Sequence, residues 1–320
     1  MTTARLLSVL VLAFGLPLGA AANDSAAVLE AGGLRLVRDV PVEILSEELL
    51  ISPDLISVDY VFRAADDRGL STIVAFPLPE YDLSWLGPEV LGGAGDSVES
   101  RSAFRVWVDG EEVTPNLEIK ALRNAIDVTQ FLADYRVPVG SLDYQATMDS
   151  LQAMPQEAKD WFAAADIVRW NEGFDPEPRW TVRATYFWTQ NFPPGRDVHV
   201  RHTYTPIAGG FIVTDGASPG FDPDDYCMTD AERAGLRNRL AESAHGAVAA
   251  RQVRYVLTTG ANWQGPIGQF RLLVDKQNAG DMVSLCFDGL SRIGPTLFEV
   301  TVPDFVPEQD LELLFISPIR

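Results

Sequence analysis

The feature that most constrains the fold is residues 179–206, where two long alternating segments flank a Pro-Pro-Gly turn. A two-residue period runs from Trp180 to Trp188 and resumes from Val198 to Tyr204. This period is typical of strands that bury one face of a sheet. We therefore expect an antiparallel hairpin in the middle of a sheet, where aromatic and β-branched cross-strand pairs supply much of the stability.

Strand-like segments dominate the rest of the chain as well. Residues 55–62 and 71–78 alternate on either side of an Asp-Asp-Arg-Gly turn, which predicts a second hairpin. Asp109-Gly110 is a strong signal for a third hairpin turn, and further apolar segments follow between residues 252 and 316. The predicted fold class is mainly β, with antiparallel β-sandwich-like domains.

One block interrupts this β pattern, a helical insertion at about residues 127–170. Its first apolar residues have the spacing of a helix face: Val128, Phe131, Leu132 and Tyr135. Asp127 suits a helix cap, residues 144–151 predict a second helix, and Pro155 suits the first position of a third. The block could be a lid, a surface for a partner, or a cover for one sheet face.

The first 22 residues have the pattern of a secretory signal peptide. Arg5 precedes the apolar run 6–18, which is about half of the ~20 residues needed to span a bilayer. The small residues that follow fit the rule for cleavage between Ala22 and Asn23. We expect a periplasmic or secreted protein with no integral membrane segment after cleavage; a retained membrane anchor is the alternative.

The remaining chain divides best at a segment rich in glycine and proline. We predict a signal peptide at 1–22, an N-terminal β domain at 23–207 that includes the helical insertion, a linker at 208–225, and a C-terminal β domain at 226–320. A short helix capped by Asp230 precedes the strands of the C-terminal domain. One large β domain is the alternative division.

The chain is strongly acidic, with 45 Asp and Glu residues against 25 Lys and Arg residues and a net charge of −20. The acidic residues are spread along the sequence, which is typical of a solvated surface. Because the electrostatic field of a strongly negative protein repels phosphate backbones, the composition argues against nucleic-acid binding.

Cys227 and Cys286 are the only cysteines of the sequence. An exported protein reaches an oxidising compartment, where paired thiols become disulfides. We therefore predict a Cys227–Cys286 disulfide that ties the 208–225 linker to the C-terminal sheet and fixes the relative position of the two domains. Two free buried cysteines are the alternative.

The catalytic and metal-binding patterns in the sequence fail on physical grounds. The segment 216–220 matches G-x-S-x-G, but Pro219 follows the serine and has no N–H for an oxyanion hole. His199 and His202 are three apart on a predicted strand, so they point to opposite faces. The acidic run 222–225 lacks the ligand spacing of a calcium loop. We predict no catalytic residue, no cofactor and no metal site.

Several short segments resemble one known family. They are Asn23-Asp24-Ser25, Gly32-Gly33-Leu34, Ser46-Glu47-Glu48-Leu49, Val74-Ala75-Phe76-Pro77-Leu78-Pro79, Asp127-Val128-Thr129, residues 188–193, His202-x-Tyr204-x-Pro206, Trp263-x-Gly265-Pro266-Ile267 and Val274-Asp275-Lys276. Together they resemble an uncharacterised bacterial exported family, domain of unknown function 4424, across nearly the whole chain after the leader. The resemblance implies an envelope location and a mainly β architecture, and it supplies no catalytic residues because the family has no assigned activity.

The expected function is that of an exported envelope protein that binds another envelope protein or a ligand without catalysis. The alternative is a carboxylate-dependent hydrolase of cell-wall or carbohydrate substrates, which no sequence motif would reveal. A structural assembly subunit is a third hypothesis. A deep pocket beneath the helices that holds two carboxylates about 5–10 Å apart would favour the enzyme.

Overall fold

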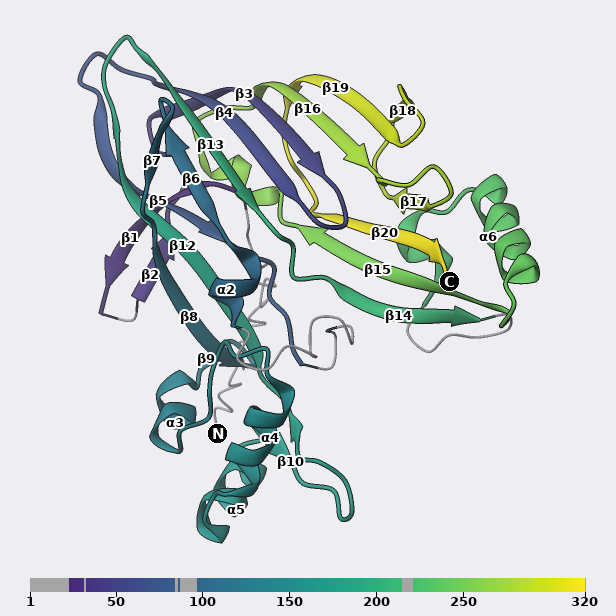
Figure 1. The fold of residues 1–320 in the computed structure, drawn as a ribbon. Coiled ribbons are helices and arrows are strands. Elements are labelled where there is room, and N and C mark those ends of the chain that lie inside the picture. Colours follow the sequence, from purple (N-terminus) through teal and green to yellow (C-terminus); the bar gives the residue numbers. More distant parts are fainter. Residues whose placement is uncertain (1–22, 32, 84–85, 87–96, 215–220, 320) are drawn as a thin grey trace, which may run out of the picture.

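The computed structural model describes residues 23–31, 33–83, 86, 97–214 and 221–319. The described strands form sheets of eight, six, four and two strands. Figure 1 shows the eight-stranded sheet across the top, the six-stranded sheet below one side of it, and the four-stranded sheet below the other. The predicted mainly β fold class is confirmed.

The eight-stranded sheet has the order β18-β19-β16-β3-β4-β13-β6-β7. Its strands are β18 (Ser291–Arg292), β19 (Leu297–Phe305), β16 (Ile267–Asp275), β3 (Val42–Ile51), β4 (Ile56–Ala64), β13 (Asp197–Tyr204), β6 (Arg105–Val108) and β7 (Glu111–Val113). Its neighbours are antiparallel except β16 and β3, which pair in parallel. The sheet thus joins strands from before and after residues 208–225.

The six-stranded sheet has the order β2-β1-β5-β12-β8-β9. Its strands are β2 (Gly33–Leu36), β1 (Ser25–Glu30), β5 (Leu70–Pro77), β12 (Thr181–Phe192), β8 (Asn116–Arg123) and β9 (Ile126–Asp127). The long strand β12 buries Val182, Ala184, Tyr186 and Trp188, which are the alternate positions that the sequence pattern assigns to one face. The short helix α2 (Val98–Ser102) precedes β6.

The four-stranded sheet consists of β14 (Gly209–Thr214), β15 (Ala247–Tyr255), β20 (Leu311–Pro318) and β17 (Met282–Leu285), in that order. Helix α6 (Asp230–Glu242) packs on this sheet through Leu236 and Leu240. Thr229 caps α6, one residue before the predicted cap at Asp230. A small sheet pairs β10 (Val168–Arg169) with β11 (Glu177–Pro178).

The predicted linker at 208–225 contains β14 and, near its end, the start of the 3-10 helix η1 (Pro223–Tyr226). Residues 215–220, which include the G-x-S-x-G match, lie outside the described residues. The division into two domains stays a prediction, and any such division has to accommodate the eight-stranded sheet that both parts share.

Two of the three predicted hairpins pair differently from the expectation. Strands β12 and β13 lie in different sheets, and so do β4 and β5, so each connection is an arch between two layers. The hairpins predicted at 179–206 and 55–78 are therefore wrong. The third prediction is confirmed, because Asp109-Gly110 joins the antiparallel strands β6 and β7.

The chemistry of the two arches explains why they do not close as hairpins. Pro193 and Pro194 have no N–H with which to extend a ladder beside the turn after β12. Gly69, at the end of the other arch, has a φ of +68°, and a Cβ there would lie 2.7 Å from the carbonyl oxygen of Phe192. The two arches thus pack against each other at a position that only glycine fits.

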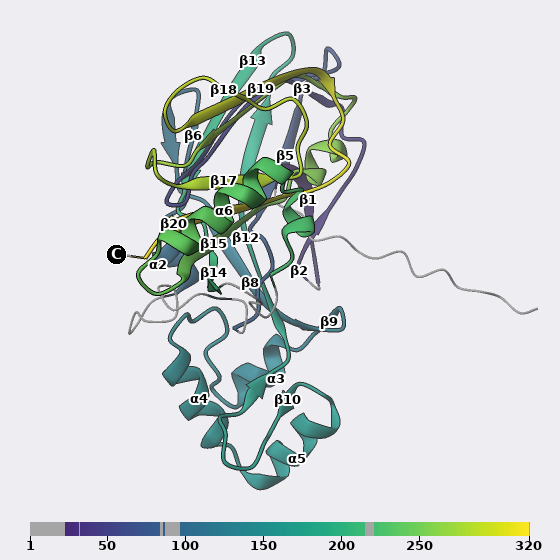
Figure 2. The same ribbon diagram turned by 90° about the vertical axis from the view of Figure 1, so that its right-hand side faces the viewer.

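The predicted helical insertion consists of α3 (Thr129–Asp134), α4 (Tyr144–Gln152) and α5 (Gln156–Ala164). Figures 1 and 2 show these helices together at one end of the molecule, beside β9 and β10 and far from α6. Each helix has a fully buried side chain: Leu132 on α3, Met148 on α4 and Phe162 on α5. The insertion therefore caps one end of the molecule and does not overlie either of the hollows described below.

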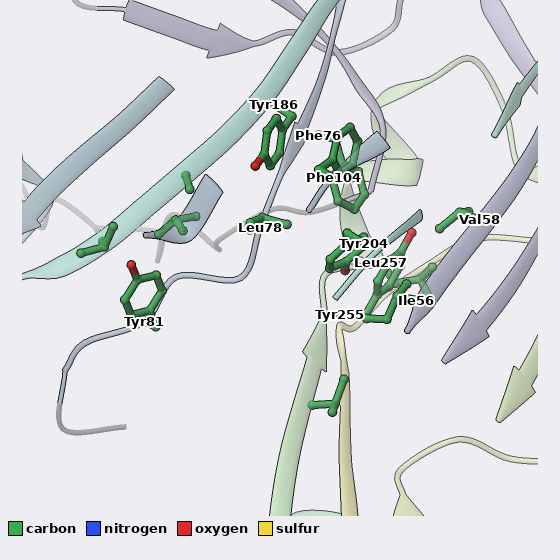
Figure 3. Packing of buried hydrophobic residues seen from close by; sticks show 14 of the residues in the cluster. Ile56, Val58, Phe76, Leu78, Tyr81, Phe104, Tyr186, Tyr204, Tyr255 and Leu257 are labelled. Atoms are coloured by element: carbon green, nitrogen blue, oxygen red, sulfur yellow. The ribbon is translucent and has the colours of Figure 1, made fainter. Parts of the chain in front are cut away.

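The main hydrophobic core lies between the inner faces of the three large sheets. Figure 3 shows aromatic side chains from several strands meeting there. The Phe104 and Tyr186 rings are stacked with centroids 4.3 Å apart, and the Phe76 and Tyr204 rings are 5.4 Å apart. A smaller core lies under α6. Within the described ranges, no helix is long and apolar enough to cross a membrane.

Candidate functional site

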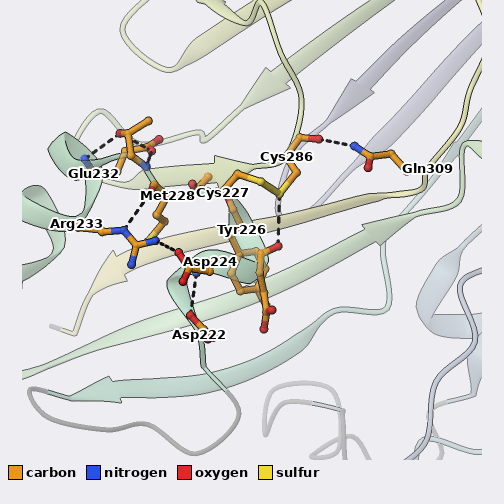
Figure 4. Close-up of a disulfide and its surroundings, with 12 residues drawn as sticks. Asp222, Asp224, Tyr226, Cys227, Met228, Glu232, Arg233, Cys286 and Gln309 are labelled. Atoms are coloured by element: carbon orange, nitrogen blue, oxygen red, sulfur yellow. Dashed lines mark hydrogen bonds and ion pairs between the residues drawn. A yellow bond between two sulfur atoms is a disulfide. The ribbon is translucent and has the colours of Figure 1, made fainter.

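Cys227 and Cys286 form a disulfide in the structure, with their Cα atoms 5.0 Å apart (Figure 4). Cys227 ends the 3-10 helix η1, and Cys286 directly follows β17. The bond therefore ties the turn before α6 to the edge strand of the four-stranded sheet. Ser284 reinforces this connection, since its hydroxyl donates to the Tyr226 carbonyl oxygen over 3.0 Å.

A cleft of about 990 Å³ opens beside the disulfide, between the edges of the eight-stranded and four-stranded sheets. Its apolar wall consists of Val283, Leu285, Phe287, Leu290, Phe298, Val302, Phe305 and Val306. Its remaining lining residues include Thr229, Glu232, Asp288, Glu308 and Gln309. The cleft has the size of a small-molecule site, and the apolar wall supplies eight of its sixteen lining residues.

The cleft exists because the core opens at the edge of the large sheet. On β16, Phe270, Leu272 and Val274 are fully buried. Their cross-strand partners on β19, Val302, Val300 and Phe298, face the same side but are only partly buried. The four-stranded sheet therefore covers β16 and leaves the inner face of β19 accessible.

The rim of the cleft is negatively charged. Asp288 and Glu308 are exposed, and no Lys or Arg occurs among the described residues that line the cleft. The Glu232 carboxylate is held in the capping box of α6, where it accepts hydrogen bonds from the backbone N–H and hydroxyl of Thr229 over 2.7 and 2.8 Å. This rim disfavours an anionic group and suits a neutral or cationic one.

A second hollow, of about 570 Å³, lies on the outer face of the eight-stranded sheet. The strand register places one row of side chains across it: Arg271, Glu48, Asp59, Arg201 and Trp107. Arg271 contacts Glu48 over 2.5 Å, and Arg201 lies 3.8 Å from Asp59. Burial raises the pKa of Asp59, and the Arg201 guanidinium partly offsets this rise. The row is polar and its charges largely compensate one another.

A third arrangement of polar groups is buried where β1, β3, β4, β13 and β15 meet. It contains Asn23, Asp24, Glu47, Tyr60 and His202, each of which is almost completely inaccessible. Asn23 is the residue that the sequence predicts to follow the cleavage point, whereas Ala22 lies outside the described residues. Being closed to solvent, these side chains form no substrate site.

The other residues singled out from the sequence lie apart. His199 is exposed in the sheet-face hollow, whereas His202 is buried on the opposite face of the same strand. Asp222 caps η1 by accepting from the Asp224 N–H over 2.9 Å, and Asp224 forms an ion pair with Arg233. Within the described ranges, no group of three or more His, Cys, Asp or Glu residues is arranged to hold a metal ion.

Sequence reasoning missed both hollows and the buried polar cluster. The cleft residues are strand residues of ordinary composition, and nothing in their spacing distinguishes a partly covered strand from a covered one. One signal was available for the buried cluster. Segments that carry the family resemblance contribute Asn23, Asp24, Glu47, His202 and Trp263 to one place, although they lie far apart in the sequence.

These observations define a mainly β, disulfide-linked protein whose surface has hollows of the size of small-molecule sites. The chain belongs to the family described as domain of unknown function DUF4424, whose model matches residues 22–314. The resemblance stated from the sequence is thereby confirmed. No protein with a curated function matches the chain.

Two solved structures illustrate what the chain is similar to. A proposed nutrient binding protein of Legionella pneumophila is 16% identical, with a TM-score of 0.48 over 92% of this chain and 70% of that one. An M1 zinc metallopeptidase of Deinococcus radiodurans is 10% identical, with a TM-score of 0.26 over 87% of this chain and 43% of that one.

Proposed function

We propose that this chain is an exported envelope protein that binds an amphipathic small molecule, without catalysis, in the cleft beside the disulfide. The observation that carries the proposal is the set of partly exposed apolar side chains on β17, β19 and the 286–290 segment. Apolar side chains normally pack into the core, and a group of them that stays open in a concavity favours a binding site.

The chemistry of the cleft limits the ligand. The phenyl groups of Phe287, Phe298 and Phe305 suit an aliphatic or aromatic body, whose transfer from water contributes about 25 cal/mol per Å² of buried apolar surface. Asp288 and Glu308 at the rim suit a neutral or cationic polar end. A fatty acid or a phosphorylated lipid would meet a repulsive rim, which the chain's net charge of −20 reinforces.

The proposed location rests on three observations. The first 22 residues read as a cleavable leader. The second observation is the disulfide, which persists in an oxidising compartment. The third is that, within the described ranges, no helix is long and apolar enough to cross a membrane. A periplasmic or secreted protein satisfies all three, and mass spectrometry of the exported protein should find Asn23 as its first residue.

Fluorescence titration with N-phenyl-1-naphthylamine, a neutral apolar probe, tests binding in the cleft. The wild-type chain should bind the probe saturably. Leu285→Glu should weaken binding at least about tenfold, because it places an unpaired charge in the apolar wall. Ile126→Glu is the matched control, since Ile126 is 65% exposed on β9 at the other end of the molecule. Equal binding by both variants would refute the site.

Competition against the bound probe tests the charge preference. Decyltrimethylammonium and decyl sulfate have the same apolar chain and opposite charges. The acidic rim predicts that the cationic compound displaces the probe at the lower concentration, and that added salt reduces the difference. If decyl sulfate competes equally well or better, the assignment of a neutral or cationic ligand is wrong.

The carboxylate-dependent hydrolase remains the second candidate, and one observation favours it. Glu48 and Asp59 are direct cross-strand partners in the hollow on the sheet face, and burial raises the pKa of Asp59 as it would for a general acid. The Arg271 and Arg201 contacts resemble ordinary surface ion pairs instead. Turnover of a cell-wall glycan that Asp59→Asn abolishes would establish the enzyme.

A further inference from the structure

Asn23 is held on every side by buried polar groups. Its backbone N–H donates to the Thr259 hydroxyl, which in turn donates to the Asn23 carbonyl oxygen over 2.7 Å. The Asn23 side-chain amide donates to Glu47 Oε2 over 3.2 Å, and its amide oxygen accepts from the hydroxyls of Tyr60 and Tyr255. If the predicted cleavage makes Asn23 the first residue, it is fixed far more firmly than chain ends usually are.

The backbone approaches Asn23 so closely that a side chain is excluded beside it. Gly260, in the 3-10 helix η2 (Thr258–Asn262), lies against the Asn23 side chain, and a Cβ there would be 2.7 Å from Asn23 Nδ2. The next residue is also anchored, because Trp263 Nε1 donates to the Asp24 carbonyl oxygen over 2.6 Å. Asn23 and Asp24 therefore lie in a closed polar site, which also contains Glu47, Tyr60, His202, Tyr255 and Thr259; we call this site the receptor.

The charges in this receptor do not balance. Asp24 and Glu47 bring two buried carboxyl groups, and His202 brings one group that can be cationic, with Nε2 3.5 Å from Asp24 Oδ1. If His202 neutralises Asp24, no other basic side chain in the described part of this cluster is left to neutralise Glu47. Burial accordingly raises the pKa of Glu47 to about 8, which shows how poorly the site accommodates the carboxylate on its own.

Hydrogen-bond acceptors are also in excess. Among the described residues of this cluster, Glu47 Oε1, both carboxylate oxygens of Asp24 and both ring nitrogens of His202 have no hydrogen-bond partner. A protonated His202 has two N–H donors for these three acceptors, so one acceptor stays unpaired. Buried polar atoms normally find partners, because leaving one unpaired destabilises the folded state. The site thus lacks both a positive charge and a donated hydrogen bond for Glu47.

We propose that this receptor binds the chain's own α-ammonium group, which is released at Asn23 when the Ala22–Asn23 peptide bond is hydrolysed, and that this group forms a buried ion pair with Glu47. The proposal rests on the leader cleavage included in the proposed function. An amide nitrogen at this position has one hydrogen, which Thr259 already accepts. An α-ammonium group carries three hydrogens and a positive charge, so it supplies both of the missing quantities.

Cleavage at this bond therefore completes the folded structure. Before it, the buried Glu47 has to stay protonated or remain unpaired, and either state destabilises the site at neutral pH. After it, the ion pair joins the N-terminus to β3, while Thr259 and Trp263 hold the same residues to the C-terminal half. The exported form is thus the more stable one.

A comparison of two purified chains tests the ion pair directly. One begins at Asn23 and the other carries a single glycine before it, each released from a fusion whose protease leaves no extra residue. The glycine moves the ammonium group out of the receptor. We expect its Tm to be about 5–8 °C lower, because a broken buried pair is strongly destabilising. In the Glu47→Gln background the difference between the two chains should nearly vanish. Glu43→Gln, on the same strand, is the matched control and should leave it unchanged.

The pH dependence gives a second and independent readout. In the glycine-extended chain the folded-state pKa of Glu47 stays raised, so stability should fall as pH rises from about 4.5 to about 8. In the chain that begins at Asn23 the pair is charged throughout this range, and stability should fall only above it, as the ammonium group loses its proton. The other titratable groups that face the site are Asp24, Tyr60, His202 and Tyr255, and both chains contain them.

Chemical labelling keeps the test open even if the glycine-extended chain does not fold. Acetic anhydride should modify the Asn23 α-amine at least about tenfold more slowly in the native chain than in urea, since the amine reacts only when this end opens. Equal Tm values for the two chains when Glu47 is unsubstituted, or a native α-amine that reacts as fast as the unfolded one, would overturn the proposal. Probe binding in the cleft is unaffected by either result, so the two proposals fail separately.

Discussion

Replacing both cysteines by serine tests how the turn before α6 and the cleft wall are held. Cys227 and Cys286 are 59 residues apart in sequence, and for a loop of this length the chain-entropy estimate is about 4 kcal/mol. Unfolding entropy is about 2.1 cal/mol/K per residue, or roughly 0.6 kcal/mol/K for a chain of about 300 residues. The double variant should therefore unfold about 6–7 °C below the oxidised wild type.

Calorimetry of the oxidised wild type, the reduced wild type and the Cys227→Ser/Cys286→Ser variant measures this directly. The last two should agree, because both lack the same covalent constraint. Both cysteines line the cleft, so probe affinity should also fall in the variant. Thiol titration of the denatured, unreduced protein should find no free cysteine. A Tm within about 1 °C of the oxidised wild type, or two titratable thiols, would refute the reasoning.

Three single substitutions test the core, one arch and a surface ion pair, each by urea denaturation at constant m-value. Phe76→Ala removes a fully buried ring that contacts Phe104 and Tyr204, and should destabilise the fold by about 3–5 kcal/mol; a loss below about 1 kcal/mol would contradict the core described above. Gly69→Ala should destabilise by more than about 1 kcal/mol, because φ is +68° and the arch carbonyl leaves no room. Arg271→Gln should change stability by less than about 1 kcal/mol, since its side chain is 39% exposed and its ion pairs are solvated.

Local patterns predicted the elements better than their partners. The period of two from Trp180 to Trp188 identified the buried face of β12, and the predicted helices at 144–151 and from Pro155 match α4 and α5 within a residue or two. The same alternation does not indicate which strand pairs with β12. β12 and β13 therefore read as a hairpin, although the Pro-Pro turn sends them into separate layers.

The sites depend on long-range geometry, so the sequence alone did not predict them. The cleft exists because β19 extends beyond the part of the large sheet that the four-stranded sheet covers. The composition of β19 does not indicate how far the four-stranded sheet reaches. The buried cluster joins Asn23 to Glu47 and Thr259, and Asp24 to His202, from separate strands and a distant 3-10 helix. The disulfide was accessible from sequence because only two cysteines exist and therefore only one pairing is possible.

A crystal structure of the chain grown with decyltrimethylammonium tests the binding proposal most directly. The proposal predicts the decyl chain between Leu285 on β17 and Phe298 on β19, with the ammonium group at the rim toward Asp288 and Glu308. Density for the compound in the hollow on the outer sheet face, with the cleft beside the disulfide empty or closed, would contradict it.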